Sequence, residues 1–132
     1  MKLTEVTTEA HRKEFIEFPK RLYRGDANWV CPLDSETEAV FDPGRNAAFA
    51  HGEATRWILS GDDGMTIGRV AAFIDEIRSG ANRQPTGGLG FFEVIESREA
   101  AFMLFDTAKQ WLADRGMKAM DGPVNFGEND NY

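Results

Sequence analysis

The junction between an apolar segment and a strongly periodic one is where this sequence most invites chemistry. Residues 89–95 are apolar or aromatic apart from Glu93, and a helical pattern begins directly after Ser97, a good helix N-cap. The free N–H groups at the start of such a helix favour an anion, and in many α/β folds this junction holds a phosphate or a cofactor. Arg98 is the cation nearest to it in the sequence.

Nucleophilic and metal chemistry have less support. Cys31 lies between Val30 and Pro32 with no base beside it, so we expect a semi-buried, unreactive thiol. His11 and His51 are far apart, and neither has a His or Cys partner at metal-ligand spacing, so no metal site is expected. His51 could line a cleft, although one ordinary hydrogen bond is the commoner role of a lone histidine.

Charge narrows the choice of partners. Lys and Arg number 15 against 22 Asp and Glu, a net charge of −7, which argues against nucleic acid. No segment approaches the roughly 20 apolar residues of a membrane span, and the N-terminus has no apolar signal core, so neither a membrane partner nor export is expected. A single cysteine suits the reducing cytoplasm. Five basic residues could meet phosphates or an acidic partner, although a solvated outer helix face is more common: Arg12, Lys13, Lys20, Arg21 and Arg24.

The elements that must position these residues follow the order β, α, α, β, β, β, α, β. Residues 2–7 alternate weakly as a strand, Thr8 can cap a helix, and Pro19 is expected to end that helix and start a second turn over residues 19–24. Residues 35–38 form a capping-box pattern for a short helix. Residues 53–60 and 65–75 flank a Gly/Asp turn and form a hairpin, whose second strand is apolar enough to be covered on both faces.

A strand–helix–strand unit follows. The strand at 89–95, the helix at 98–115 and the strand at 117–120 predict parallel strands joined by a right-handed crossover, with Gly116 as a left-handed C-cap. The helix should bury one apolar stripe: Ala101, Leu104, Phe105, Ala108, Trp111 and Leu112. The Gly- and Pro-rich residues 79–88 should form a mobile loop. The fold class is therefore α/β, a mixed sheet of three antiparallel strands followed by the parallel unit, with helices on both faces.

Polar residues gather just past the last predicted strand: Asn125, Asn129, Asp130 and Asn131. Because ligands bind at the carboxyl ends of strands in open sheets, the cluster could contact a ligand. A flexible linker explains it equally well.

Several segments resemble the GNAT acyltransferase superfamily. IGRVAAFID (67–75), GFFE (90–93) and AKQWLADRGM (108–117) resemble its third strand, its fourth strand and the end of its crossover helix. FPKRLY (18–23), NWV (28–30) and DGPVN (121–125) more narrowly resemble an uncharacterised bacterial branch of GNAT-like proteins, whose members are longer than this chain. The resemblance implies that residues 1–132 form a single, incomplete domain, the N-terminal portion of the fold without its C-terminal part.

The resemblance also implies an activity. GNAT enzymes transfer an acyl group from acetyl-CoA or another acyl-CoA to an amine. Glu93 would then be the general base, and the alternative is a solvated or paired strand carboxylate. Backbone groups of Phe91, Phe92 and Val94 would pair with the pantetheine arm of the cofactor, and Arg98 would lie nearest to its phosphates.

The sequence departs from the superfamily in two ways. Its phosphate loop, Gln/Arg-x-x-Gly-x-Gly/Ala, reads IESREAA here at residues 95–101, without a glycine, and Glu96 and Glu99 would repel a phosphate. The alternative is a non-catalytic binding or scaffold module with a degenerate CoA site. The superfamily also continues beyond its fifth strand, so an open sheet edge predicts self-association of this chain.

Overall fold

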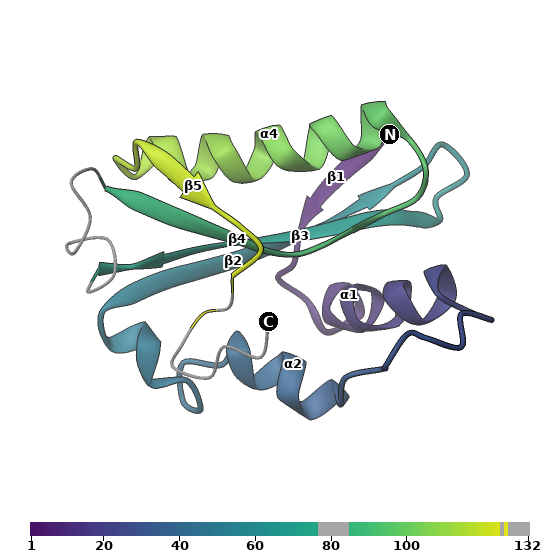
Figure 1. Cartoon of the computed structure of the whole chain (residues 1–132), viewed down its shortest axis with the longest axis horizontal. Helices are drawn as coiled ribbons and strands as arrows, with labels where there is room; N and C mark the ends of the chain where they lie inside the picture. Colours follow the sequence, from purple (N-terminus) through teal and green to yellow (C-terminus); the bar gives the residue numbers. More distant parts are fainter. Residues whose placement is uncertain (77–84, 125, 127–132) are drawn as a thin grey trace.

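A five-stranded mixed sheet with helices on both faces forms the body of the protein (Figure 1). The computed structural model describes residues 1–76, 85–124 and 126. The strands are β1 (Lys2–Glu5), β2 (Gly52–Ser60), β3 (Thr66–Asp75), β4 (Thr86–Val94) and β5 (Ala119–Asp121). The helices are α1 (Glu9–Leu22), α2 (Asp34–Val40), the 3-10 turn η1 (Ala47–Ala50) and α4 (Arg98–Asp114).

The sheet order is β1-β2-β3-β4-β5. The first four strands pair antiparallel, and β5 pairs parallel with β4 through the crossover helix α4. Helix α4 covers one face, whereas α1 and α2 cover the other (Figure 1). The predicted α/β class, the antiparallel hairpin and the parallel unit are thereby confirmed.

Strand β3 separates two hydrophobic cores. Residues 70–74 are all buried because they face α4 and the α1/α2 layer in alternation, as the doubly apolar pattern predicted. The core under α4 consists mostly of aliphatic residues: Trp57, Leu59, Val70, Ala72, Ile74, Leu89, Ala100, Leu104, Ala108 and Leu112. The other core is largely aromatic and contains Phe15, Ala48, Ile58, Ala71, Phe73 and Phe126.

Helix α4 buries a narrower stripe than predicted. Its buried positions are four residues apart: Ala100, Leu104, Ala108 and Leu112. Phe105 is 41% exposed, so its predicted place in the stripe is wrong. One step along a helix turns a side chain by about 100°, which carries Phe105 away from the line through Leu104. A side chain at Gly68 of β3 would lie 2.6 Å from Leu104, so the missing Cβ lets the helix pack closely.

The ends of α4 agree with the sequence. The Ser97 hydroxyl accepts a hydrogen bond from the Ala100 N–H at 3.2 Å, which confirms Ser97 as the N-cap. Gly116 has a φ of 85°, the left-handed conformation expected of a glycine just after a helix.

Helix α1 runs through Pro19 as one element, so the predicted break before that proline is wrong. Pro19 has no N–H to offer the carbonyl of Phe15 one turn earlier. The buried guanidinium of Arg69 on β3 takes the place of that N–H, with Nη1 2.7 Å from the Phe15 oxygen. A tertiary contact therefore satisfies the group that the proline leaves without a partner.

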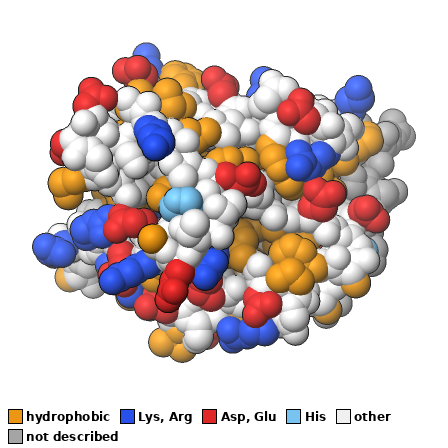
Figure 2. Space-filling view, turned by 180° about the vertical axis from the view of Figure 1, so that it is seen from behind, with side chains coloured by type: hydrophobic (Ala, Val, Ile, Leu, Met, Phe, Trp, Pro, Cys, Tyr) orange, Lys and Arg blue, Asp and Glu red, His pale blue; other side chains and the backbone are white. Residues whose placement is uncertain are grey.

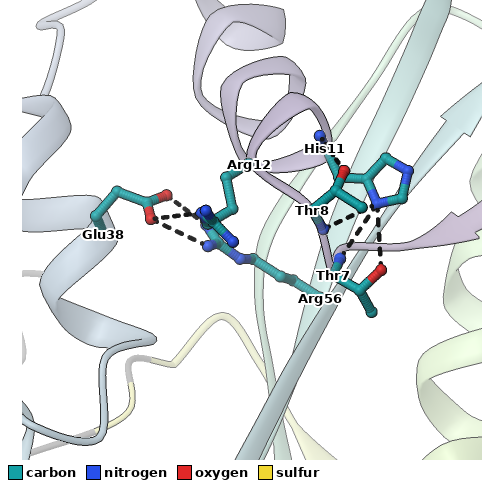
Figure 3. A network of polar contacts seen from close by, with 6 residues as sticks. All are labelled: Thr7, Thr8, His11, Arg12, Glu38 and Arg56. Carbon is teal, nitrogen blue, oxygen red and sulfur yellow. Dashed lines mark hydrogen bonds and ion pairs between the residues drawn. The ribbon is translucent and has the colours of Figure 1, made fainter.

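The N-terminus of α1 has the predicted cap. The Thr8 hydroxyl accepts from the His11 N–H at 3.1 Å, and His11 Nδ1 accepts from the Thr8 N–H at 3.3 Å and the Thr7 N–H at 3.2 Å (Figure 3). This reciprocal arrangement is a capping box in which a histidine takes the place of the usual glutamate.

Helix α2 is held by an ion pair whose arginine is buried, and it has no side-chain cap. It begins at Asp34 after an N-cap at Leu33 that makes no side-chain hydrogen bond, so the predicted capping box at Ser35 is wrong. The guanidinium of Arg56, a residue only 5% exposed, donates to the two carboxylate oxygens of Glu38 at 2.9 and 3.3 Å (Figure 3). Its central carbon lies 4.2 Å from the ring centre of Phe41.

The observed strand boundaries differ from the predicted ones by a few residues. Strand β4 begins at Thr86, inside the segment predicted as a loop, whereas residues 79–84 of that segment lie outside the described residues. The edge strands β1 and β5 have four and three residues. Self-association through a sheet edge stays a prediction. Within the described ranges, no helix is long and apolar enough to cross a membrane.

We expect Glu38→Ala to lower the free energy of unfolding by about 2–3 kcal/mol in a urea titration. The reason is that it leaves the buried charge of Arg56 without its partner. The double variant Glu38→Ala/Arg56→Met should recover part of this loss, since no unpaired charge remains. Glu17→Ala, which removes a partner of Lys20 at the surface, should change stability by less than about 1 kcal/mol. Equal losses in both single variants would contradict a special role for the buried pair.

Candidate functional site

A β-bulge in β4 shapes the candidate site. Arg69 of β3 pairs with Glu93, and Ala71 pairs with Gly90, so three steps along β4 oppose two along β3. Phe91 lies in this bulge with a φ of 52°, a conformation that bulky residues rarely adopt. Bulges of this kind often lie beside active sites because they redirect side chains.

The bulge changes which way the β4 residues face. Gly90 and Phe91 both face the α1/α2 layer: a Cβ at Gly90 would lie 2.9 Å from the Phe73 ring, and the Phe91 ring centre is 5.9 Å from that of Phe15. Phe92 and Val94 pack against the core under α4. The side chains of the predicted cofactor residues Phe91, Phe92 and Val94 therefore belong to the two cores, which leaves their backbone groups for a ligand.

Glu93 lies on the α1 side of the sheet, and Tyr23 is its hydrogen-bond partner. The Tyr23 hydroxyl donates to Glu93 Oε2, and both residues are half-buried. This hydrogen bond, then burial and the carboxylate charge, raise the pKa of Tyr23 to about 12, while the positive charge of Arg69 acts in the opposite direction. Glu93 thus contacts an element far from it in the sequence.

An aromatic stack supports Tyr23 from the other side. Its ring lies on the indole of Trp29, with ring centres 5.1 Å apart and planes inclined by 24°. Sequence reasoning gave Tyr23 no part in the site and missed its contact with Glu93. No local signal could have revealed this contact, because 70 residues separate the two partners.

The outer edge of β4 is paired along part of its length. Strand β5 pairs only with residues 86–88, and the Val124 N–H adds one bond to the Leu89 carbonyl at 3.0 Å. In the described part of the chain, no strand continues beside residues 91–94. An extended molecule that carries amide groups could pair with such an edge, as peptides do with open sheets.

The junction before α4 fits a phosphate group less well. The Ser97 N–H donates to the Ile95 carbonyl at 2.7 Å, and the Ser97 hydroxyl already caps Ala100. Arg98, Glu96 and Glu99 are all exposed, so one positive charge stands among two negative ones. The open strand edge can thus pair with an extended molecule, whereas the junction lacks a glycine cradle for a phosphate.

The other predicted site residues lie elsewhere. Cys31 is exposed, so its predicted semi-buried place is wrong; the segment that carries it projects from the surface, with Val30 85% and Leu33 64% exposed. His51 pairs with Asp75, with 3.0 Å between Nδ1 and Oδ1. No group of three metal-ligating side chains gathers among the described residues. Asn125 and residues 129–131 lie outside the described residues.

The basic cluster of α1 is an outer face interspersed with carboxylates. Lys20 Nζ lies 2.9 Å from Asp34, and Arg21 lies 2.9 Å from Glu14. Figure 2 shows basic and acidic side chains mixed over the region where α1 lies. The charged outer helix face, the commoner explanation of the cluster, accounts for these contacts.

Two curated bacterial proteins are similar to this chain in sequence. The bacterial ceramide synthase of Caulobacter vibrioides is 36% identical over 130 residues, which cover 95% of this chain and 33% of that protein. Protein YghO of Escherichia coli is 30% identical over 117 residues, 89% of this chain and 30% of that protein. The chain thus spans about a third of the length of both relatives. No protein-family model matches it.

Solved structures show which fold this is. AAC(6')-Iy, solved with the bisubstrate analogue CoA-S-monomethyl-acetylneamine, superposes with a TM-score of 0.61 at 18% identity, over 94% of this chain and 79% of that one. A GNAT-family acetyltransferase of Staphylococcus aureus gives 0.59 at 11% identity, over 93% and 74%. Glucosamine-6-phosphate N-acetyltransferase of Arabidopsis thaliana gives 0.58 at 15% identity, over 93% and 82%. The mixed sheet, its crossover helix and these superpositions together show that the chain has the GNAT acetyltransferase fold.

Proposed function

We propose that this chain contributes to transfer of an acyl group from an acyl-CoA to an amine. The observation that carries the proposal is the position of Glu93, at a β4 bulge beside a strand edge that β5 leaves open. The superposed AAC(6')-Iy structure holds a CoA-based bisubstrate analogue, which supports an acyl-CoA donor. Fold alone does not fix function, so the proposal depends on this site.

The chemistry needs a base and a place for the donor. The donor supplies an activated thioester carbonyl, which the amine nitrogen attacks; the C–S bond breaks, an amide forms, and the thiolate that leaves takes up a proton from solvent. Glu93 would accept the proton that the amine loses. Backbone groups of Phe91, Phe92 and Val94 would hold the pantetheine arm, and Arg98 would contact the phosphates of the acyl-CoA.

An exposed free thiol at Cys31 suits a reducing compartment, so we propose the cytoplasm as the location of this activity.

We further propose that the acceptor is a long-chain amine. Ceramide is the amide of a fatty acid and a long-chain amine, and a ceramide synthase is 36% identical to this chain. The exposed Val30 and Leu33 follow Trp29, whose ring stacks on the tyrosine that contacts Glu93. An alkyl chain could lie along this segment while its amino group reaches the carboxylate.

The second candidate function is a scaffold without catalysis. This function is favoured by Glu96 and Glu99 beside the junction and by the absence of a glycine at residues 95–101.

Calorimetry with acetyl-CoA separates the two functions, since a scaffold should give neither heat nor a thermal shift at millimolar ligand. If the site is merely weakened, the double variant Glu96→Gln/Glu99→Gly should tighten CoA binding. It removes two carboxylates that repel the CoA phosphates, and it adds a glycine whose backbone can approach them. An unchanged affinity would favour the scaffold.

We expect Glu93→Gln to lower kcat for amide formation by roughly a hundredfold or more. The amide side chain keeps the shape of Glu93 but cannot accept the proton. The measurement is release of free CoA thiol in the presence of an amine. Glu53→Gln, which alters a carboxylate that pairs with Arg115 at the surface, is the control and should retain full activity. Similar rates for both variants would remove Glu93 from the mechanism.

We expect Val30→Asp/Leu33→Asp to raise KM about tenfold or more for a long-chain amine and to leave KM for a short-chain amine unchanged. Each apolar side chain contributes about 1.5 kcal/mol when it is covered by an alkyl chain, and 1.4 kcal/mol corresponds to a factor of ten. Phe102→Asp on α4 serves as a matched change at another exposed apolar residue. Equal effects on both amines would contradict the long-chain acceptor.

A further inference from the structure

Tyr23 connects the end of α1 to the strand that carries Glu93. It is the C-cap residue of α1, and its hydroxyl donates to Glu93 Oε2. Among the described residues, no hydrogen bond to the other carboxylate oxygen, Oε1, is present. The carboxylate is therefore held through one oxygen, while the second can still accept a hydrogen bond.

The Tyr23 ring is itself held in place. Its backbone N–H donates to the Pro19 carbonyl at 2.9 Å, and its own carbonyl accepts from the Asp26 N–H at 2.9 Å. Trp29, whose N–H donates to the Asp26 carbonyl at 3.3 Å, stacks on the ring. These contacts orient the hydroxyl before any ligand arrives, which is what a preorganised site requires.

Two charged residues lie near this contact, one on β3 and one in the loop after α1. Arg69 on β3 pairs with Glu93 in the sheet register, and its Nη1 is already bonded to the Phe15 carbonyl. Asp26, in the loop after α1, adds a negative charge near Tyr23. Tyr23 is thus the neutral donor in this group, and it can orient the carboxylate without neutralising its charge.

We propose that Tyr23 is a positioning residue for acyl transfer: it holds Oε2 of Glu93 so that Oε1 remains for the amino group of the acceptor. The inference rests on the proposed function and deepens it.

The test is Tyr23→Phe, which keeps the ring on Trp29 and removes the hydroxyl. We expect kcat to fall about tenfold while KM for the acyl-CoA stays unchanged, because the lost hydrogen bond holds a charged group that acts in the chemical step. Thr107→Val is the control, because it removes a hydroxyl on α4 that bonds the Met103 carbonyl. A kcat unchanged by Tyr23→Phe would overturn the proposal.

A second measurement does not depend on activity. The chain has two tyrosines, so Tyr132→Phe leaves Tyr23 as the only one, and its ionisation can be followed by ultraviolet absorbance. Circular dichroism would show the pH range in which the protein stays folded. The Tyr23 pKa of about 12 should fall towards the ordinary value of 10.0 in Glu93→Gln, because the carboxylate that favours the neutral phenol is gone.

The two measurements separate the possible failures. An ordinary Tyr23 pKa in the parent chain, or one unmoved by Glu93→Gln, would overturn the contact itself. Coupled titration in a chain that transfers no acyl group would overturn the proposed function and leave Tyr23 as a structural clamp. Coupled titration together with a lowered kcat in Tyr23→Phe would support both proposals.

Discussion

The buried guanidinium of Arg69 connects helix α1 with the central strand β3, beside the strand that bears the candidate site. Arg69 lies in the central strand, donates to the Phe15 carbonyl that Pro19 leaves without an N–H, and lies 4.6 Å from the Phe15 ring centre. The same residue faces Glu93 across the sheet. A cation in such a place is stable only with close partners, because burial of an unpaired charge is costly. This requirement fixes helix α1 against β3, the neighbour of the strand that bears the candidate site.

The bulge in β4 determines which way the residues of the candidate site face. It places Gly90 and Phe91 on one side of the sheet and thereby lets Glu93 face α1. A side chain at Gly90 would lie 2.3 Å from the Val124 carbonyl oxygen, so the segment after β5 can cross here only over a glycine. The conformation of Phe91 is unfavourable by itself, and the surrounding aromatic rings maintain it. The strained backbone at Phe91 therefore depends on the packing of the aromatic residues around it.

The acceptor side of the proposed site is better formed than the donor side. The acceptor end has a carboxylate held by a tyrosine, which an indole supports in turn. The donor end has an open strand edge but two carboxylates near the start of α4. Electrostatic repulsion there acts on the phosphates, not on the reacting carbonyl, so it affects affinity more than chemistry. Under the proposed function, these two carboxylates should weaken binding of the donor.

The sequence by itself determined the order of elements, the class of sheet and the caps at Thr8 and Ser97, because periodicity and capping depend on neighbours in the chain. It pointed to Glu93 through resemblance alone. Only the tertiary structure decided that α1 continues through Pro19, that Cys31 is exposed and that Tyr23 meets Glu93. Each of these depends on a partner, or on open space, contributed by residues far away in the sequence, and no local pattern encodes such a contact.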